Sequence, residues 1–219
     1  YLADHFKRAR AESVGEPENV MQELVQGLKA GLIDERTAVA ILIVLVGAAG
    51  ESTSSLVGSA IRMLAEEEEL QQQLRTSPEL IDVFVEEVVR LESPFRGHYR
   101  DVIEDSQLGG ESIPAGSRLI LLWAAANRDP TVFSAPDRVD LERANPEQHL
   151  GFGYGIHFCI GARVARMEAR IILQELLART ASFSLDASQP AQHVDSIFVR
   201  RLPALEISLA RAKRVEAID

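Results

Sequence analysis

Apolar residues recur at helical spacing through the first part of the chain. One such set predicts an amphipathic helix and consists of Val20, Met21, Leu24, Val25 and Leu28. A much longer pattern runs from about Arg36 to Glu66, and acidic residues at its start favour a helix N-terminus. Because the centre of this segment is apolar on all sides, we expect a helix that is buried on all sides. Two acidic segments within residues 65–91 predict further helices.

From residue 95 the pattern changes. Residues 98–123 contain short apolar pieces separated by Gly-Gly and Pro-Ala-Gly, which predicts small β-strands joined by turns. Residues 127–149 have no sustained period, so we expect irregular but ordered structure. Residues 162–180 return to a helical pattern, with one expected face formed by Ala165, Ala169, Ile172 and Leu176 and another by Arg163, Arg166 and Arg170. With short strands expected in the tail, the fold class is mainly α with small β-sheets.

Composition narrows the functions that are open to this chain. It has 219 residues, of which 46% are hydrophobic and 26% charged, as in a soluble globular protein. The net charge of −10 argues against nucleic-acid binding through phosphate contacts. A single cysteine excludes an internal disulfide and suits a reducing, cytoplasmic setting. The apolar stretch 38–49 is shorter than the roughly 20 residues that cross a bilayer, so we expect a core helix and no membrane.

The cysteine stands in a glycine-rich stretch, GFGYGIHFCIG, at residues 151–161. Its glycines allow sharp turns and a close approach to a flat ligand. Cys159 lies just ahead of a helical pattern, and N–H groups at a helix N-terminus favour a thiolate, which is a soft metal ligand. A lone cysteine is also often an inert core residue. A hydrolase would need an orienting partner for His157, and zinc would need about four ligands where this stretch offers two.

This stretch resembles the haem-binding signature of the cytochrome P-450 family. The matching positions are Phe152, Gly153, Gly155, His157, Cys159 and Gly161. The resemblance implies haem b (iron protoporphyrin IX) as the cofactor and Cys159 as the proximal thiolate on its iron. It also implies that Phe152 packs beside the cysteine and that His157 reaches a haem propionate. Thiolate ligation of haem iron favours cleavage of the O–O bond of bound dioxygen.

A second motif lies in the long helical pattern, where GAAGESTSS occupies residues 47–55. Glycine inside a helix costs roughly 1 kcal/mol relative to alanine, which points either to close helix packing or to a locally loosened helix beside a ligand. The stretch resembles the central helix of the same family, with Ala49 against the haem and Glu51 as the acid. Ser52 then stands where the family usually has threonine; serine keeps the hydroxyl but loses the methyl that fixes its rotamer. Proton delivery is thus expected from Glu51 with Ser52 or Thr53.

Three further features resemble the family. Glu87 and Arg90 match its Glu-x-x-Arg motif and can pair at a spacing of three on a helix. Arg138 stands at the expected Pro-x-Arg place, with Arg143 as the alternative third member of a network that locks the cysteine loop to the core. Such a buried network is costly to break. The remaining expected haem contacts are Arg100, at a propionate, and Ala165.

The resemblance extends over nearly the whole chain but matches only the C-terminal half of the family. We therefore expect residues 1–219 to be the C-terminal haem-binding part of a single larger domain, with an N-terminal half absent. Tyr1 is no initiator methionine and no signal peptide follows it, which agrees with a start partway through a longer protein.

The implied function is that of a soluble bacterial haem-thiolate monooxygenase. It would use dioxygen to hydroxylate or epoxidise an apolar small molecule, with a natural product of secondary metabolism as the expected substrate. The electrons would come from a ferredoxin-type partner, for which Arg163, Arg166 and Arg170 offer a basic patch. Residues expected to line the substrate pocket are Val46, Gly50, Phe95, His98, Ile197 and Phe198. The alternatives are a haem-free accessory or scaffold protein for a partner enzyme, and a truncated, inactive folding unit.

Overall fold

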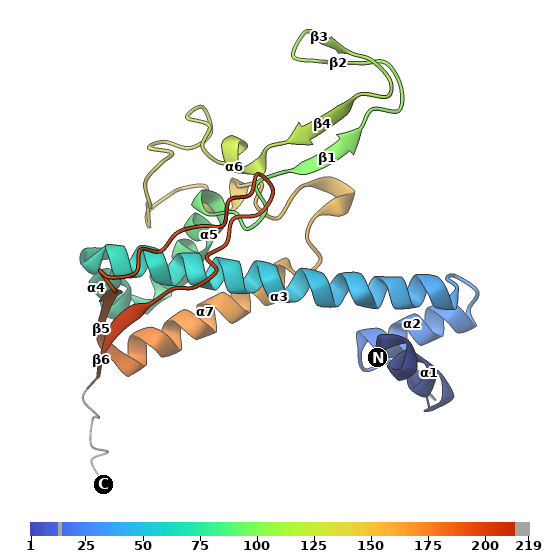
Figure 1. Ribbon diagram of the computed structural model, residues 1–219, viewed down its shortest axis with the longest axis horizontal. Coiled ribbons are helices and arrows are strands. Elements are labelled where there is room, and N and C mark those ends of the chain that lie inside the picture. The colour runs from blue at the N-terminus through green and yellow to red at the C-terminus, as the bar shows by residue number, and fades with distance from the viewer. Residues whose placement is uncertain (13–14, 213–219) are drawn as a thin grey trace. The chain divides into compact units, whose positions relative to one another are not determined.

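The computed structural model describes residues 1–12 and 15–212 of the chain (Figure 1). The chain divides into two compact units, Tyr1–Glu51 and Ser52–Asp219. Helix α3 (Glu35–Glu66) contributes its first half to one unit and its second half to the other.

The first unit packs α1 (Leu2–Glu12) and α2 (Val20–Lys29) against the start of α3. Its core consists of Phe6, Val25, Ala38 and Leu42. The Asn19 side chain caps α2 by accepting the Gln22 N–H at 3.1 Å, which confirms the helix predicted from the apolar spacing. Asp34 accepts hydrogen bonds from Thr37 in the same way at the start of α3, and these bonds hold the pKa of the Asp34 carboxyl below its ordinary value.

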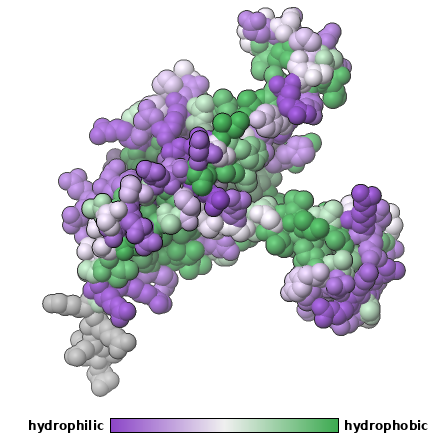
Figure 2. Space-filling model, in the orientation of Figure 1, coloured by the Kyte–Doolittle hydropathy of each residue, from purple (hydrophilic) through white to green (hydrophobic). Residues whose placement is uncertain are grey.

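Helix α3 is continuous, but the prediction that it is buried on all sides is wrong. Ile43, Val44 and Val46 are 57%, 67% and 62% exposed, and apolar surface is visible on the right-hand part of the helix in Figure 2. The reason is that only one side of this stretch meets α1 and α2. A Cβ atom added at Gly47 or Gly50 would meet no described atom within 4 Å, so neither close packing nor local loosening of the helix is observed there.

By length and composition, α3 also passes the test for a membrane-spanning helix. Its most apolar 18-residue window has a mean hydropathy of 1.7 and is 17% buried. The core helix of a soluble protein passes the same test, so a single such helix is weak evidence for a membrane span.

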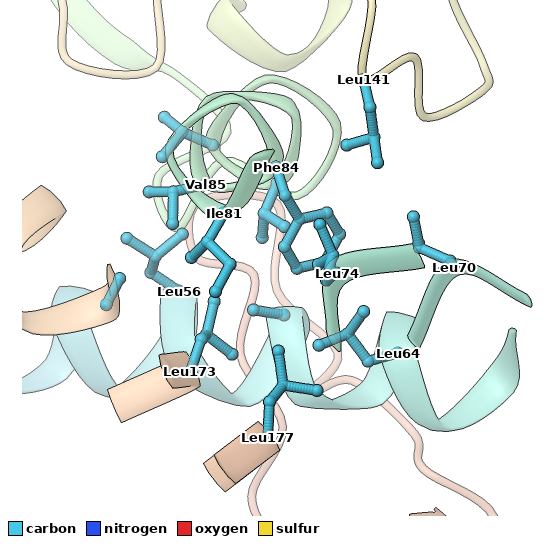
Figure 3. Close-up of a cluster of buried hydrophobic side chains, with 14 of the residues drawn as sticks. Leu56, Leu64, Leu70, Leu74, Ile81, Phe84, Val85, Leu141, Leu173 and Leu177 are labelled. Carbon is cyan, nitrogen blue, oxygen red and sulfur yellow. The ribbon is translucent and has the colours of Figure 1, made fainter. Parts of the chain in front are cut away.

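The second unit is built around the end of α3, with α4 (Glu68–Thr76), α5 (Ile81–Leu91) and α7 (Ala162–Arg179) around it. Figure 3 shows side chains from all four helices meeting in one apolar cluster, among them Leu56, Leu64, Leu74, Phe84 and Leu173. The buried face of α7 consists of Ala162, Ala169, Leu173 and Leu177, so the predicted face through Ile172 is offset by one residue. Both sets have helical spacing, and packing against the neighbouring helices buries Leu173 and Leu177.

Three small antiparallel sheets complete the described part of this unit. Strand β1 (His98–Asp101) pairs with β4 (Arg118–Leu121), β2 (Ser106–Leu108) with β3 (Glu111–Ile113), and β5 (Thr180–Leu185) with β6 (Ile207–Arg211). Gly109 and Gly110 form the β2–β3 turn at φ values of 60° and 88°, which confirms the predicted Gly-Gly turn. The short helix α6 (Trp123–Ala126) and the 3₁₀ turns η1 (Pro78–Leu80), η2 (Pro146–Gln148) and η3 (Gly155–His157) lie in the connections. The predicted mainly-α architecture with small β-sheets is therefore observed.

Candidate functional site

The cysteine loop, residues 151–161, runs directly into α7. Gly153 and Gly155 have φ values of 75° and 72°, a backbone conformation that favours glycine. The Cys159 N–H donates to the Phe152 carbonyl at 2.8 Å and closes the loop. The Cys159 thiol is free and exposed just before the first residue of α7. Position and backbone thus present an exposed sulfur just ahead of a helix N-terminus.

Apolar residues flank the cysteine along the loop. Ile156 and Ile160 are 96% and 89% exposed, and Phe158 is half exposed. A Cβ atom on Gly161 would lie 3.9 Å from the Cys159 sulfur, which is an ordinary van der Waals separation. One soft donor within an exposed apolar loop fits a flat, apolar group that carries a metal. Among the described residues, no group of three or more His, Cys, Asp or Glu could hold a metal ion.

Gly151 has a packing role against α5. A Cβ atom there would lie 2.5 Å from Val89 Cγ1 and 3.0 Å from the Val89 carbonyl oxygen. The glycine is therefore required at this position because the loop packs directly on α5.

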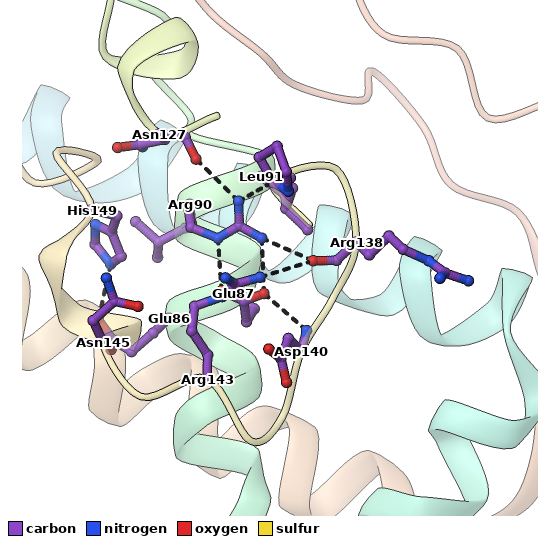
Figure 4. Close-up of polar contacts among 12 residues, drawn as sticks. Glu86, Glu87, Arg90, Leu91, Asn127, Arg138, Asp140, Arg143, Asn145 and His149 are labelled. Carbon is purple, nitrogen blue, oxygen red and sulfur yellow. Dashed lines mark hydrogen bonds and ion pairs between the residues drawn. The ribbon is translucent and has the colours of Figure 1, made fainter. Parts of the chain in front are cut away.

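A buried ion-pair network at Glu87 joins α5 to the irregular segment before the cysteine loop (Figure 4). Arg90 donates to both carboxylate oxygens of Glu87, at 2.7 and 2.8 Å, and the Arg143 Nε donates to the same carboxylate at 2.8 Å. Burial raises the pKa of Glu87, but the hydrogen bonds from Arg90 and Arg143 bring it below its ordinary value. Both guanidinium groups also lie over the Phe133 ring.

The third member of this network is Arg143 and not Arg138. Arg138 contributes its backbone carbonyl, which accepts from Arg90 at 2.9 Å, while its own side chain points away into solvent (Figure 4). Both arginines stand in the same short segment, and only the folded path of the chain decides which guanidinium faces the core.

A second buried carboxylate, Glu86, was not anticipated from the sequence. It accepts two hydrogen bonds from Arg166 on α7, at 2.6 and 2.7 Å, and lies 2.9 Å from the His149 Nε2. Burial raises the pKa of Glu86, but Arg166 and His149 together bring it below its ordinary value. The signal was present in the sequence, since Glu86 and Glu87 are adjacent acids in a helix that is otherwise largely apolar.

These contacts change the expected basic patch. Arg166 is paired with Glu86, and Arg170 lies 3.7 Å from Asp82. Arg163 is exposed. The three arginines therefore do not form one uncompensated basic surface, because α5 supplies a carboxylate to two of them.

The other predicted cofactor and proton-transfer residues are placed as follows. Arg100 is exposed on β1 and donates to the Tyr99 carbonyl at 2.8 Å, His157 is exposed at the end of η3, and Ala165 is half-buried on α7. In the first unit, Ala49 and Glu51 are exposed on α3. In the second unit, Ser52 and Thr53 are half-buried on the continuation of the same helix.

Three of the predicted pocket residues form an aromatic cluster within the second unit. The rings of Phe95, His98 and Phe198 lie 5.5 to 5.6 Å apart, and the Trp123 indole N–H donates to His98 Nδ1 at 2.7 Å. Ile197 is exposed beside Phe198. Val46 and Gly50 are both exposed and belong to the first unit.

A third buried carboxylate, Glu92, attaches the C-terminal segment around Phe198 and Arg200 to the end of α5. Glu92 accepts two hydrogen bonds from Arg200, at 2.6 and 2.8 Å, and also pairs with Arg62 at 3.3 Å. The Arg96 N–H donates to the Phe198 carbonyl, so backbone contacts reinforce the attachment. Glu92 was likewise missed, because its partners are remote in sequence.

Comparison with known proteins gives one consistent result. The family model described as Cytochrome P450 matches residues 4–201. "Cytochrome P450 144" of Mycobacterium tuberculosis (strain ATCC 25618 / H37Rv) is 44% identical over 209 residues, which cover 95% of this chain and 47% of that protein.

Two solved structures are similar to the chain. P450BioI in complex with hexadec-9Z-enoic acid ligated acyl carrier protein has a TM-score of 0.85 and 32% identity, covering 95% of this chain and 52% of its own. CYP109E1 from Bacillus megaterium in complex with corticosterone has a TM-score of 0.85 and 31% identity, covering 94% and 56%.

The chain spans about half the length of the relatives it matches. Those relatives are haem b proteins and monooxygenases by family, and their fold is the mainly-α fold with small sheets that was expected. The chain belongs to the cytochrome P450 family.

Proposed function

We propose that the chain is the C-terminal haem-binding part of a haem-thiolate monooxygenase that hydroxylates or epoxidises an apolar small molecule. The observation that carries this proposal is the free, exposed Cys159 thiol at the start of α7, on an apolar loop locked to a buried ion-pair network. When bound to a thiolate, haem supplies the activation of dioxygen.

We assign haem binding and proton transfer to the following residues. Cys159 supplies the sulfur ligand for the haem iron, and Phe152, Gly153, Gly161 and Ala165 supply the haem contacts on the same side. Arg100 and His157 supply cationic or hydrogen-bonding groups for the haem propionates, and Ala49 leaves space for the haem on α3. The Ser52 hydroxyl, with Glu51 and Thr53 on the same helix, holds and passes protons.

The substrate is an apolar natural product, in line with the aromatic cluster of Phe95, His98 and Phe198 and with the exposed Val46, Gly50 and Ile197. Two similar structures hold a fatty acyl chain and a steroid, both mainly apolar. A ferredoxin-type protein supplies electrons in the bacterial cytoplasm. The paired state of Arg166 and Arg170 means that Arg163 is the exposed cation of this helix face to test for that contact.

The haem-thiolate proposal is tested on the full-length protein by its spectrum after reduction and addition of CO. The expected result is a Soret band at the position typical of thiolate-ligated haem, and Cys159→Ser should abolish this band. Arg163→Ser, which alters the same loop and helix junction without removing the sulfur, should keep it. A protein that takes up no haem would contradict the proposal and favour the haem-free accessory alternative.

A further inference from the structure

We propose that Glu86 and Arg166 are positioning residues that hold the Phe152 ring and, through it, the backbone that carries Cys159. This inference rests on the proposed role of Cys159 and adds residues that lie outside the family motifs identified in the sequence. It starts from the pair itself, which joins α5 to α7 by two hydrogen bonds at 2.6 and 2.7 Å.

The Arg166 guanidinium has a second contact besides Glu86. Its central carbon lies 4.5 Å from the centroid of the Phe152 ring, which is within the range of a cation–π contact. Glu86 is buried and accepts hydrogen bonds from both the Nε and an Nη of Arg166. This bidentate contact fixes the orientation of the guanidinium plane. The pair therefore presents a fixed flat surface to the aromatic ring.

His149 holds the same ring from another side. Its Nδ1 accepts the Gly151 N–H at 3.2 Å, so its Nε2 carries the proton that is donated to Glu86 at 2.9 Å. The His149 and Phe152 rings lie 5.6 Å apart. Glu86 thus contacts two groups that both lie against Phe152, Arg166 on α7 and His149 just before the loop.

Phe152 connects these contacts to the cysteine. Its carbonyl oxygen accepts the Cys159 N–H at 2.8 Å, and its ring lies 6.3 Å from the Phe158 ring next to the cysteine. A displacement of the Phe152 backbone would move both contacts. The chain from Glu86 through Arg166 and Phe152 to the Cys159 amide is continuous, with hydrogen-bond or ring contacts at each step.

The chain contains a matched control for this inference. Arg170 lies one turn further along α7, and its partner Asp82 lies one turn earlier on α5 than Glu86. This second pair is exposed and has a 3.7 Å separation. It joins the same two helices with the same charges, an arginine on α7 and a carboxylate on α5, but it has no contact with Phe152 among the interactions of the described residues.

The test is hydrogen exchange of the Cys159 amide in the folded full-length protein. We expect Arg166→Leu to accelerate exchange about tenfold or more, as for the loss of a hydrogen bond to a charged group. Arg170→Leu should leave the rate unchanged, and Arg166→Lys should restore part of the protection. If Arg166→Leu does not fold, Glu86→Gln provides the same comparison. Unchanged exchange in a folded Arg166 or Glu86 variant, or an equal effect of Arg170→Leu, would overturn the proposal.

A double variant tests whether Arg166 acts through Phe152. In a Phe152→Leu background, Arg166→Leu should add little further acceleration. An undiminished effect in that background would show a direct structural role instead and would overturn the inference. The exchange rate is measured independently of haem, so a failed haem spectrum for the native protein would count against the proposed function alone. As a second readout, the share of haem with a thiolate-type CO spectrum should fall in Arg166→Leu and not in Arg170→Leu.

Discussion

The Arg143 Nε and the Glu87 carboxylate lie 2.8 Å apart, although 56 positions separate them in the chain. Both side chains are almost completely excluded from solvent. The contact attaches the irregular segment before the cysteine loop to α5, and it makes the geometry of that segment depend on one buried carboxylate.

Removing one member of this network should therefore lower the free energy of unfolding. We expect Arg143→Ala to lower the free energy of unfolding by about 1.5 to 3 kcal/mol, because it removes a buried hydrogen bond to the Glu87 carboxylate, which then has Arg90 as its remaining arginine partner. Arg138→Ala should change it by no more than about 0.5 kcal/mol, since its side chain is exposed and only its carbonyl joins the network. Urea unfolding of the two variants makes the comparison. An equal loss in both would contradict the assignment of Arg143.

The close approach of Gly151 to Val89 leads to a second prediction, which concerns stability. In Gly151→Ala the new methyl group would overlap Val89, and we expect a loss of about 1 to 3 kcal/mol in unfolding free energy from overpacking. Val89→Ala in the same chain should recover part of that loss because it removes the nearest atom. Gly161→Ala is the control, since its added carbon has its nearest neighbour at 3.9 Å and should be tolerated by the fold. The measurement is thermal unfolding of the native chain, Gly151→Ala, the double variant with Val89→Ala, and Gly161→Ala.

Sequence patterns predicted the elements that depend on local periodicity and turn chemistry. The helix through Val20 and the Gly109–Gly110 turn both follow from such rules, and both are observed. The face of α7 did not follow, because sets through Ile172 and through Leu173 satisfy the same period. Only the neighbouring helices distinguish them, by filling the space around Leu173.

In the site, too, features set by local sequence were predicted and features set by contacts between distant segments were not. The position of Cys159 ahead of a helix could be read from spacing, and so could the pairing of Glu87 with Arg90. The choice of Arg143 and the pairing of Glu86 with Arg166 could not, because they depend on contacts between segments far apart in sequence. The available hint was chemical, since two adjacent glutamates in an apolar helix need cationic partners if they are buried.

The hydrogen bond from Trp123 to His98 predicts a pH dependence. Burial, reinforced by the charge of Arg100, lowers the pKa of His98, so the folded chain favours the neutral ring that accepts this bond. The unfolded chain has an ordinary histidine pKa of about 6.5, so stability from this group is full above that pH. It should decline as pH falls from there toward the lower folded pKa, because the unfolded chain binds the proton more readily.

The measurement is the NMR shift of the Trp123 indole N–H, together with urea unfolding at several pH values below 7. Protonation of His98 removes the acceptor, so the indole resonance should move with a midpoint below the ordinary histidine value. His98→Phe should abolish the shift. His193, whose pKa is also lowered by burial, contributes to stability in the same direction, and His193→Asn separates its share. A midpoint at or above the ordinary value would contradict the prediction.

The attachment of the tail to Glu92 makes the last prediction. Glu92→Gln keeps the shape of the side chain but removes the charge that Arg200 and Arg62 share, so we expect the tail to open locally more often. The amides of Arg96 and Arg200, which bond to the Phe198 and Pro94 carbonyls, should then exchange about tenfold faster, as for the weakening of one charged hydrogen bond. Asp101→Asn, which breaks the exposed pair with Arg118, should leave these rates unchanged and cost at most about 1 kcal/mol. Equal exchange in the native chain and Glu92→Gln would mean that the backbone bridge between Phe95 and Val199 holds the tail without help from the carboxylate.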